Sequence, residues 1–263
     1  MREVWITMDR NHVLKEFEKY TSAYNPEDVK VKLKIDHTYR VAELCDKLAK
    51  SLNLAREECD FAWMSGMFHD IGRFEQLRIY HTFQDNISVN HAVLSADILF
   101  KKERLIDCFI DDKDFDYELM EKVIRYHNVY ILPANQGERE RMFCNILRDA
   151  DKIDILRVNC ETPPTEIYDL PEEAFTEAEI TDEVFEAVMR SENVDRNFSK
   201  TGIDYVLGHM AFVFGLVFSE SFRQVKNQGY IWQLTDFKSN NPETVRKMQM
   251  IKENLIKYID NHL

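Results

Sequence analysis

Histidine and aspartate side chains recur on the apolar faces of successive predicted helices. The set comprises four histidines and two aspartates on five segments: His37, His69, Asp70, His91, His127 and Asp151. His37, for example, is in phase with Val41, Leu44 and Leu48 at helical spacing. Because imidazole and carboxylate groups are costly to bury without a partner, we expect packed helices around one or two buried cations. A ligand set of nitrogen and oxygen without thiolate suits Fe, Mn or Zn.

The adjacent pair His69 and Asp70 is the most informative local feature of this set. A single histidine on an apolar stripe is more often an ordinary core residue, so the inference rests on the whole set. His69 and Asp70 close the apolar segment FAWMSGMF, and Gly72 follows at once. Neighbours on a helix point about 100° apart. We expect a helix end at Gly72, where both side chains can turn toward one centre.

Composition favours an all-α fold. The chain has 263 residues, of which 44% are hydrophobic, with only 7 Gly and 6 Pro. Such a composition favours long helices over a sandwich or barrel. The periodicity predicts helices over 10–22, 27–52, 55–71, 87–103, 117–128, 138–158, 173–190, 201–224 and 242–262. We expect residues 72–85 to be irregular and 161–173 to be a Pro-rich break.

Charge and cysteine content narrow the partners and the compartment. The formal net charge of −13 argues against a nucleic-acid polymer as partner. The five cysteines are odd in number and form no CxxC motif, and the first residues are not typical of a signal peptide. We therefore expect a cytoplasmic protein. The longest apolar run, 203–218, is shorter than the ~20 residues of a membrane span, so we expect a buried helix there and no membrane association.

The order of the motifs resembles that of the HD superfamily of metal-dependent phosphohydrolases. A histidine in a first long helix is followed by HDIGR (69–73), NHAVLSADIL (90–99), VIRYHN (123–128) and LRDADKID (147–154). The resemblance covers roughly residues 28–160. It implies an HD-domain helical bundle over 28–160. With the additional C-terminal helices of 161–263 packed on that core, we expect one helical domain over 1–263.

The resemblance also implies the ligands. The minimal family site matches His37, His69, Asp70 and Asp151, and a richer branch with a second metal adds His91 and His127. In that branch the aspartate of the HD pair, here Asp70, bridges the two metals. The family pattern places the last ligand directly after alanine, which selects Asp151 over Asp149. The implied cofactors are two divalent ions, Fe or Mn first, with Zn, Ni, Co or Mg as alternatives.

The six-ligand set is similar to those of HD-GYP phosphodiesterases and di-iron diadenosine tetraphosphate hydrolases. It also resembles that of mixed-valence di-iron oxygenases such as inositol oxygenase. The leading expectation is a phosphohydrolase acting on a small phosphate ester or nucleotide through a metal-activated water. The alternatives are a di-iron oxygenase and a regulatory HD module that binds a nucleotide. The sequence is compatible with an oligomer.

Four further residues are candidates for substrate binding. Arg73, directly after HDIG, is the first, because a cation there contacts phosphate in relatives and arginine binds phosphate bidentately. Arg78 and Lys152 are weaker candidates, with surface ion pairs as the alternative. His81 is a candidate proton donor to the leaving group. We thus expect Asp70 and Arg73 to be catalytic, and Arg73, Arg78, Lys152 and His81 to contact the substrate.

Overall fold

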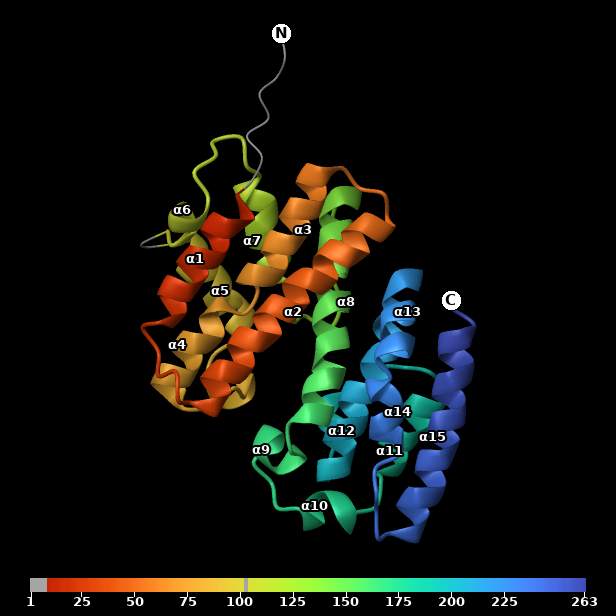
Figure 1. Ribbon diagram of the computed structural model, residues 1–263. Helices are drawn as coiled ribbons and strands as arrows, with labels where there is room; N and C mark the ends of the chain where they lie inside the picture. The colour runs from red at the N-terminus through yellow and green to blue at the C-terminus, as the bar shows by residue number, and fades with distance from the viewer. Residues whose placement is uncertain (1–8, 102–103) are drawn as a thin grey trace. The chain divides into compact units, whose positions relative to one another are not determined.

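The computed structural model describes residues 9–101 and 104–263 and divides the chain into two compact units (Figure 1). The first unit is Met1–Ala150 and the second is Asp151–Leu263. The described residues are helices, turns and loops without a strand, so the predicted all-α fold class is confirmed. The arrangement as one domain with an HD core and a packed extension stays a prediction.

The first unit contains the helices that carry most of the predicted ligands. They are α1 (Arg10–Thr21), α2 (Val29–Ser51), α3 (Arg56–Phe68), α4 (Ile71–Tyr80), α5 (His91–Phe100), α6 (Ile106–Phe109), α7 (Tyr117–Arg125) and the first half of α8 (Glu138–Glu161), with a 3-10 turn η1 (Asp85–Ile87). Side-chain caps fix several starts: Asp28 accepts from the Lys30 N–H, Asn90 from the Val93 N–H and Asp116 from the Leu119 N–H.

Helices α2 and α3 pack closely because a glycine lies at their contact. A Cβ atom on Gly66 would lie 2.5 Å from the Ala42 Cα atom and 2.7 Å from its nitrogen. Both Ala42 and the neighbouring Val41 are completely buried. The small pair Gly66 and Ala42 therefore lets the two backbones approach, which brings His37 on α2 near the end of α3.

The prediction that residues 72–85 are irregular is wrong for most of that segment. Helix α3 ends at Phe68, and after His69 and Asp70 a new helix, α4, runs over Ile71–Tyr80. Gly72 lies in the first turn of α4 instead of ending a helix. Its role is close packing, because a Cβ atom there would lie 2.6 Å from the Ser95 nitrogen, and the Gly72 N–H donates to Ser95 Oγ. The chain leaves α4 at His81, which has φ 58°.

The second unit contains the remainder of α8 and the C-terminal helices. These are α9 (Pro164–Tyr168), α10 (Glu173–Thr176), α11 (Asp182–Met189), α12 (Gly202–Met210), α13 (Ser219–Gln228), α14 (Tyr230–Thr235) and α15 (Pro242–Asp260), with 3-10 turns η2 (Arg196–Phe198) and η3 (Ala211–Gly215). Its buried apolar residues include Ile203, Leu207, Ile251 and Leu255. Thr201 and Asp204 form a reciprocal capping box at the start of α12.

Two long helices predicted in the second unit are interrupted. The expected helix 173–190 is divided into α10 and α11, and the expected helix 201–224 into α12, η3 and α13. At Gly215 the carbonyl accepts a hydrogen bond from Lys152 Nζ (2.8 Å), and a Cβ atom would collide with Lys152 and Asn193. Gly215 is the last residue of η3, so this contact lies where the helical run is interrupted, and no helical periodicity could reveal it.

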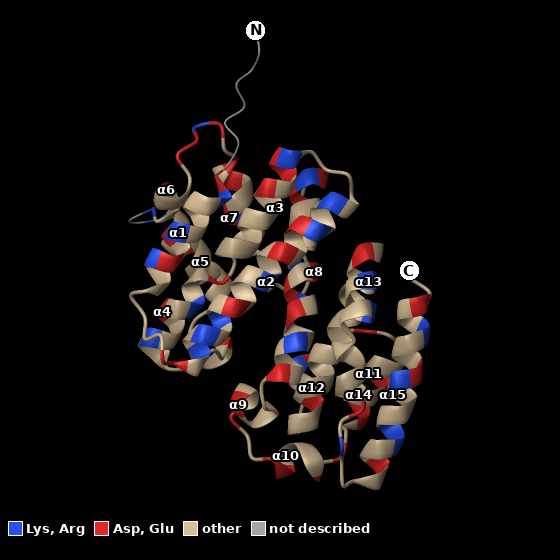
Figure 2. Cartoon of the chain, viewed as in Figure 1, with Lys and Arg blue, Asp and Glu red and all other residues tan. Residues whose placement is uncertain are grey.

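Charged residues lie along the helices, as expected for helix faces in contact with solvent. Figure 2 shows acidic and basic residues interspersed along α2 and α15. Within residues 9–101 and 104–263, none of the helices combines the length and the apolar character that a membrane span requires.

Candidate metal centre

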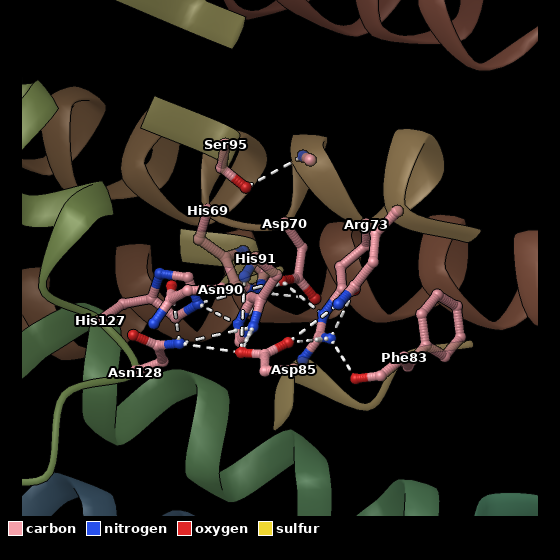
Figure 3. Close-up of polar contacts among 12 residues, drawn as sticks. His69, Asp70, Arg73, Phe83, Asp85, Asn90, His91, Ser95, His127 and Asn128 are labelled. Carbon is pink, nitrogen blue, oxygen red and sulfur yellow. Dashed lines mark hydrogen bonds and ion pairs between the residues drawn. The ribbon is translucent and has the colours of Figure 1, made fainter. Parts of the chain in front are cut away.

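Five of the six predicted ligands converge in the first unit. His37 comes from α2, His69 and Asp70 from the turn between α3 and α4, His91 from the first residue of α5, and His127 from the turn after α7. Each is at most 7% exposed. In Figure 3, His69, Asp70, His91 and His127 lie around one centre. The fold thus collects nitrogen and oxygen donors from four places in the sequence.

The two oxygens of Asp70 face different histidine pairs. Oδ2 lies 3.6 Å from His37 Nε2 and 3.5 Å from His69 Nε2. Oδ1 lies 3.7 Å from His91 Nε2 and 3.9 Å from His127 Nε2. Two groups of three donors result, each within 4.8 Å and both containing Asp70. We call them half-site A (His37, His69, Asp70) and half-site B (Asp70, His91, His127).

The spacing of the imidazole nitrogens fits a metal ion in each half-site. The Nε2 atoms of His37 and His69 are 3.3 Å apart, and those of His91 and His127 are 3.0 Å apart. Two nitrogens at about 2.0–2.1 Å from one ion, in tetrahedral or octahedral geometry, are roughly 2.9–3.4 Å apart. Both measured separations agree with this range.

Hydrogen bonds to the second ring nitrogen fix which nitrogen faces the centre. His69 Nδ1 donates to the Gly66 carbonyl and His127 Nδ1 to the Ile124 carbonyl, both at 2.7 Å. His91 Nδ1 donates to Asp85 Oδ2 at 2.6 Å. The Nε2 lone pairs of His91 and His127 therefore point at one another across 3.0 Å, an arrangement that a cation between them would stabilise.

The pKa values of the buried groups favour cation binding. Burial and the positive charge of Arg73 lower the pKa of His91 to about 4, against the opposing effect of Asp85. Burial alone would raise the pKa of Asp70, but Lys34, His69 and Arg73 outweigh it and hold that pKa well below its usual range. At neutral pH the centre thus offers an unprotonated imidazole and an ionised carboxylate.

Asp85 supports half-site B and was missed by the sequence analysis. Besides His91, its carboxylate accepts hydrogen bonds from Arg73 Nη1 (3.0 Å), Gln76 Nε2 (3.0 Å) and Asn128 Nδ2 (3.2 Å). Figure 3 shows Asp85 between His91 and Arg73. Asp85 lies in a segment without periodicity, so its one sequence signal is its place six residues before His91.

Two cations approach Asp70 from opposite ends of its carboxylate. Arg73 Nε lies 3.6 Å from Oδ1, while its Nη1 donates to Gln76, to the Phe83 carbonyl and to Asp85. Lys34 Nζ lies 2.7 Å from Oδ2. Lys34 was also missed by the sequence analysis, although it lies one turn before His37 and so shares its helix face.

The remaining predicted residues have other surroundings. Arg78 forms an exposed ion pair with Glu75. A surface ion pair was the alternative to substrate binding that the sequence left open for Arg78. His81 is exposed at the C-terminal end of α4. Lys152 and Asp151 belong to the second unit, where Lys152 donates to the Gly215 carbonyl. Asp149 is completely buried in the first unit. The role of Asp151 as a ligand stays a prediction.

Comparison with known families identifies the segment that carries this centre. Residues 35–159 match the family model of the HD domain. Neither the curated proteins nor the solved structures contain a significant match. HD domains bind divalent metals and are commonly metal-dependent phosphohydrolases. The matched segment contains all five residues of the buried histidine–aspartate cluster.

Proposed function

We propose, on the premise that residues 35–159 form an HD domain, that this protein is a phosphohydrolase with two divalent ions bridged by Asp70. The substrate is a small phosphate ester or a nucleotide. His37 and His69 would hold one ion with Asp70 Oδ2, and His91 and His127 the other with Oδ1. Asp151 is the predicted additional ligand. Fe or Mn suits this set of imidazole and carboxylate donors.

The main support for the proposal is that the two oxygens of the Asp70 carboxylate face two different pairs of histidines. Each Asp70 oxygen lies within 4 Å of two Nε2 atoms. A site for a single ion needs no second pair of buried histidines. Bound divalent ions lower the pKa of a coordinated water and so supply hydroxide at neutral pH. Asp70, which contacts both half-sites, would set the spacing between the ions.

The chain's own residues would bind and orient the phosphoryl group. Arg73 has its Nη1 fixed by three acceptors, while its Nε lies 3.6 Å from Asp70 Oδ1. A guanidinium anchored at one end can stabilise charge that develops on a phosphoryl oxygen without reorganising. Gln76 and Asp85 would keep it in place, because both accept hydrogen bonds from it.

The charge of the molecule favours a small substrate over a polymer. The net charge of −13 would repel a polyanion at long range. Local cations, of which Arg73 and Lys34 lie nearest to Asp70, would have to offset that repulsion for a single phosphate group. We therefore propose a phosphorylated metabolite or mononucleotide, and no nucleic-acid or membrane partner.

The decisive experiment combines metal analysis with an activity panel. We expect two Fe or Mn ions per chain and hydrolysis of at least one phosphomonoester, phosphodiester or nucleotide, equally with and without O₂. Asp70→Asn should lose both metal and activity, whereas Asp107→Asn, in an exposed ion pair with Arg104, should lose neither. Turnover that requires O₂ would instead identify a di-iron oxygenase. Metal-independent nucleotide binding without turnover would identify a regulatory module.

A further inference from the structure

Lys34 and a metal ion in half-site A would compete for the same oxygen atom. Lys34 Nζ lies 2.7 Å from Asp70 Oδ2, and the Lys34 side chain is 14% exposed. The same Oδ2 faces His37 Nε2 and His69 Nε2 at 3.6 and 3.5 Å. An ammonium group and a divalent cation repel one another when they share one carboxylate oxygen. Occupation of half-site A would therefore weaken the attraction between Asp70 and the ammonium group of Lys34 and favour its release.

Phe83 provides the displaced ammonium group with a second contact. Lys34 Nζ lies 5.5 Å from the Phe83 ring centroid, and Arg73 Cζ lies 5.6 Å from the same centroid. A cation–π contact attracts a cation without neutralising its charge. Lys34 can therefore leave Asp70 and remain beside the centre as a positive charge.

Of the two cations, Lys34 is the one that is free to move. Arg73 Nη1 is fixed by hydrogen bonds to Gln76, Phe83 and Asp85. For Lys34, the contacts within the described part of the chain are the ion pair with Asp70 and the Phe83 ring. Its flexible four-carbon stem carries a compact charge with three donors, which suits binding to a tetrahedral oxyanion.

We propose that Lys34 is a phosphate-binding residue that becomes available only when a metal ion occupies half-site A. Without metal, Lys34 neutralises Asp70; with metal, its ammonium group is released to a phosphoryl oxygen of the substrate. Metal occupancy would thus control the affinity for phosphate. This inference rests on the proposed metal site, but it concerns binding and does not require hydrolysis.

The test uses Mn²⁺ and inorganic phosphate as probes, with calorimetric titration of the full chain. Lys34→Met keeps the apolar stem and removes the charge. We expect it to bind Mn²⁺ as tightly as the wild type or tighter, because the competitor is gone. We expect the Mn²⁺-loaded variant to bind phosphate at least 10-fold more weakly than the loaded wild type. Lys32→Met, an exposed position on the same helix, is the matched control and should change neither affinity.

Other outcomes would overturn the inference. Weaker Mn²⁺ binding in Lys34→Met would mean that Lys34 orders Asp70 as part of the structure. Equal phosphate affinity in both proteins, or equal phosphate binding by metal-free and loaded wild type, would also refute it. Lys34→Gln repeats each measurement in case the methionine variant misfolds. If phosphate binding depends on Mn²⁺ and Lys34 but no ester is hydrolysed, the hydrolase proposal alone fails.

Discussion

Asp85 connects the candidate ligands to the cation beside them. One of its oxygens accepts from His91 Nδ1, and the other accepts from Arg73 and Gln76. Burial alone would raise the pKa of Asp85, but hydrogen bonding to His91 and the charges of His91 and Arg73 lower it overall. Asp85 thus stays ionised and fixes both the tautomer of His91 and the position of Arg73.

We predict that Asp85→Asn weakens metal binding at half-site B. The amide group would present either a donor to the His91 Nδ1–H or a weaker, neutral acceptor, so the orientation of His91 Nε2 would be lost. Loss of such a supporting partner costs roughly 10- to 100-fold in metal affinity. Mn²⁺ titration should show one ion weakened and the ion at half-site A retained. Two unchanged binding steps would rule out this role of Asp85.

Arg73 and Arg78 form a natural pair of variants on one helix. We predict that Arg73→Ala retains metal but loses on the order of 10²-fold in kcat/KM on a phosphate substrate, as expected for a group that stabilises phosphoryl charge. Arg78→Ala should have little effect, because Arg78 is paired with Glu75 at the surface. Steady-state kinetics with metal analysis decide this. Full activity of Arg73→Ala would show that Arg73 is not needed for turnover.

Long, strongly periodic helices could be predicted from the sequence, and positions set by tertiary contacts could not. The predicted segments 27–52 and 138–158 correspond closely to α2 and α8. Gly72 misled the prediction because the reason for a glycine there is the backbone of Ser95, more than 20 residues away in the chain.

The same distinction applies to the candidate centre. Five of the proposed ligands could be predicted because a histidine or an aspartate interrupts the apolar residues of a predicted helix. Asp85, in a non-periodic turn, gave no such signal. Lys34 did lie on the face of His37, but a lysine near the start of a helix resembles an ordinary solvated residue. Its ion pair with Asp70 depends on how α2 packs against the following helices.

Helix packing at Gly66 leads to a stability prediction. We predict that Gly66→Ala lowers the free energy of unfolding by roughly 1–3 kcal/mol, because the new methyl group would overlap the backbone of Ala42. Gly208→Ala on α12 is the control, since a Cβ atom there meets nothing within 4 Å. That change should be neutral or stabilising by up to about 1 kcal/mol, from helix propensity. Urea unfolding followed by circular dichroism measures both, and a neutral Gly66→Ala would refute the close packing.

Each unit contains a histidine that folding keeps neutral. In the second unit, His209 Nδ1 lies 2.7 Å from the Tyr168 hydroxyl and 3.0 Å from Asn159 Nδ2. Burial and the charge of Arg196 lower the pKa of His209 to about 3. In the first unit the pKa of His91 is lowered to about 4. Between pH 4 and 6.5 the unfolded chain therefore binds more protons than the folded chain at both positions.

We predict that the metal-free protein loses stability as the pH falls from 7 to 5. A histidine whose pKa is depressed on folding contributes stability above its unfolded pKa of about 6.5, and this contribution declines as the pH falls toward the folded pKa. Each of the two histidines should account for about 1–2 kcal/mol over this interval. His209→Gln should reduce the slope in chelated protein. An unchanged slope would mean that His209 binds protons equally in both states.

Helix α8 runs without interruption through the boundary between Ala150 and Asp151. Since each helical N–H bonds to the carbonyl four residues earlier, the first residues of the second unit complete their backbone bonding with the last residues of the first. The family match also ends inside this helix, at residue 159. A fragment of this chain cut at the boundary would begin or end in mid-helix, and the backbone groups at the cut would lose their helical partners.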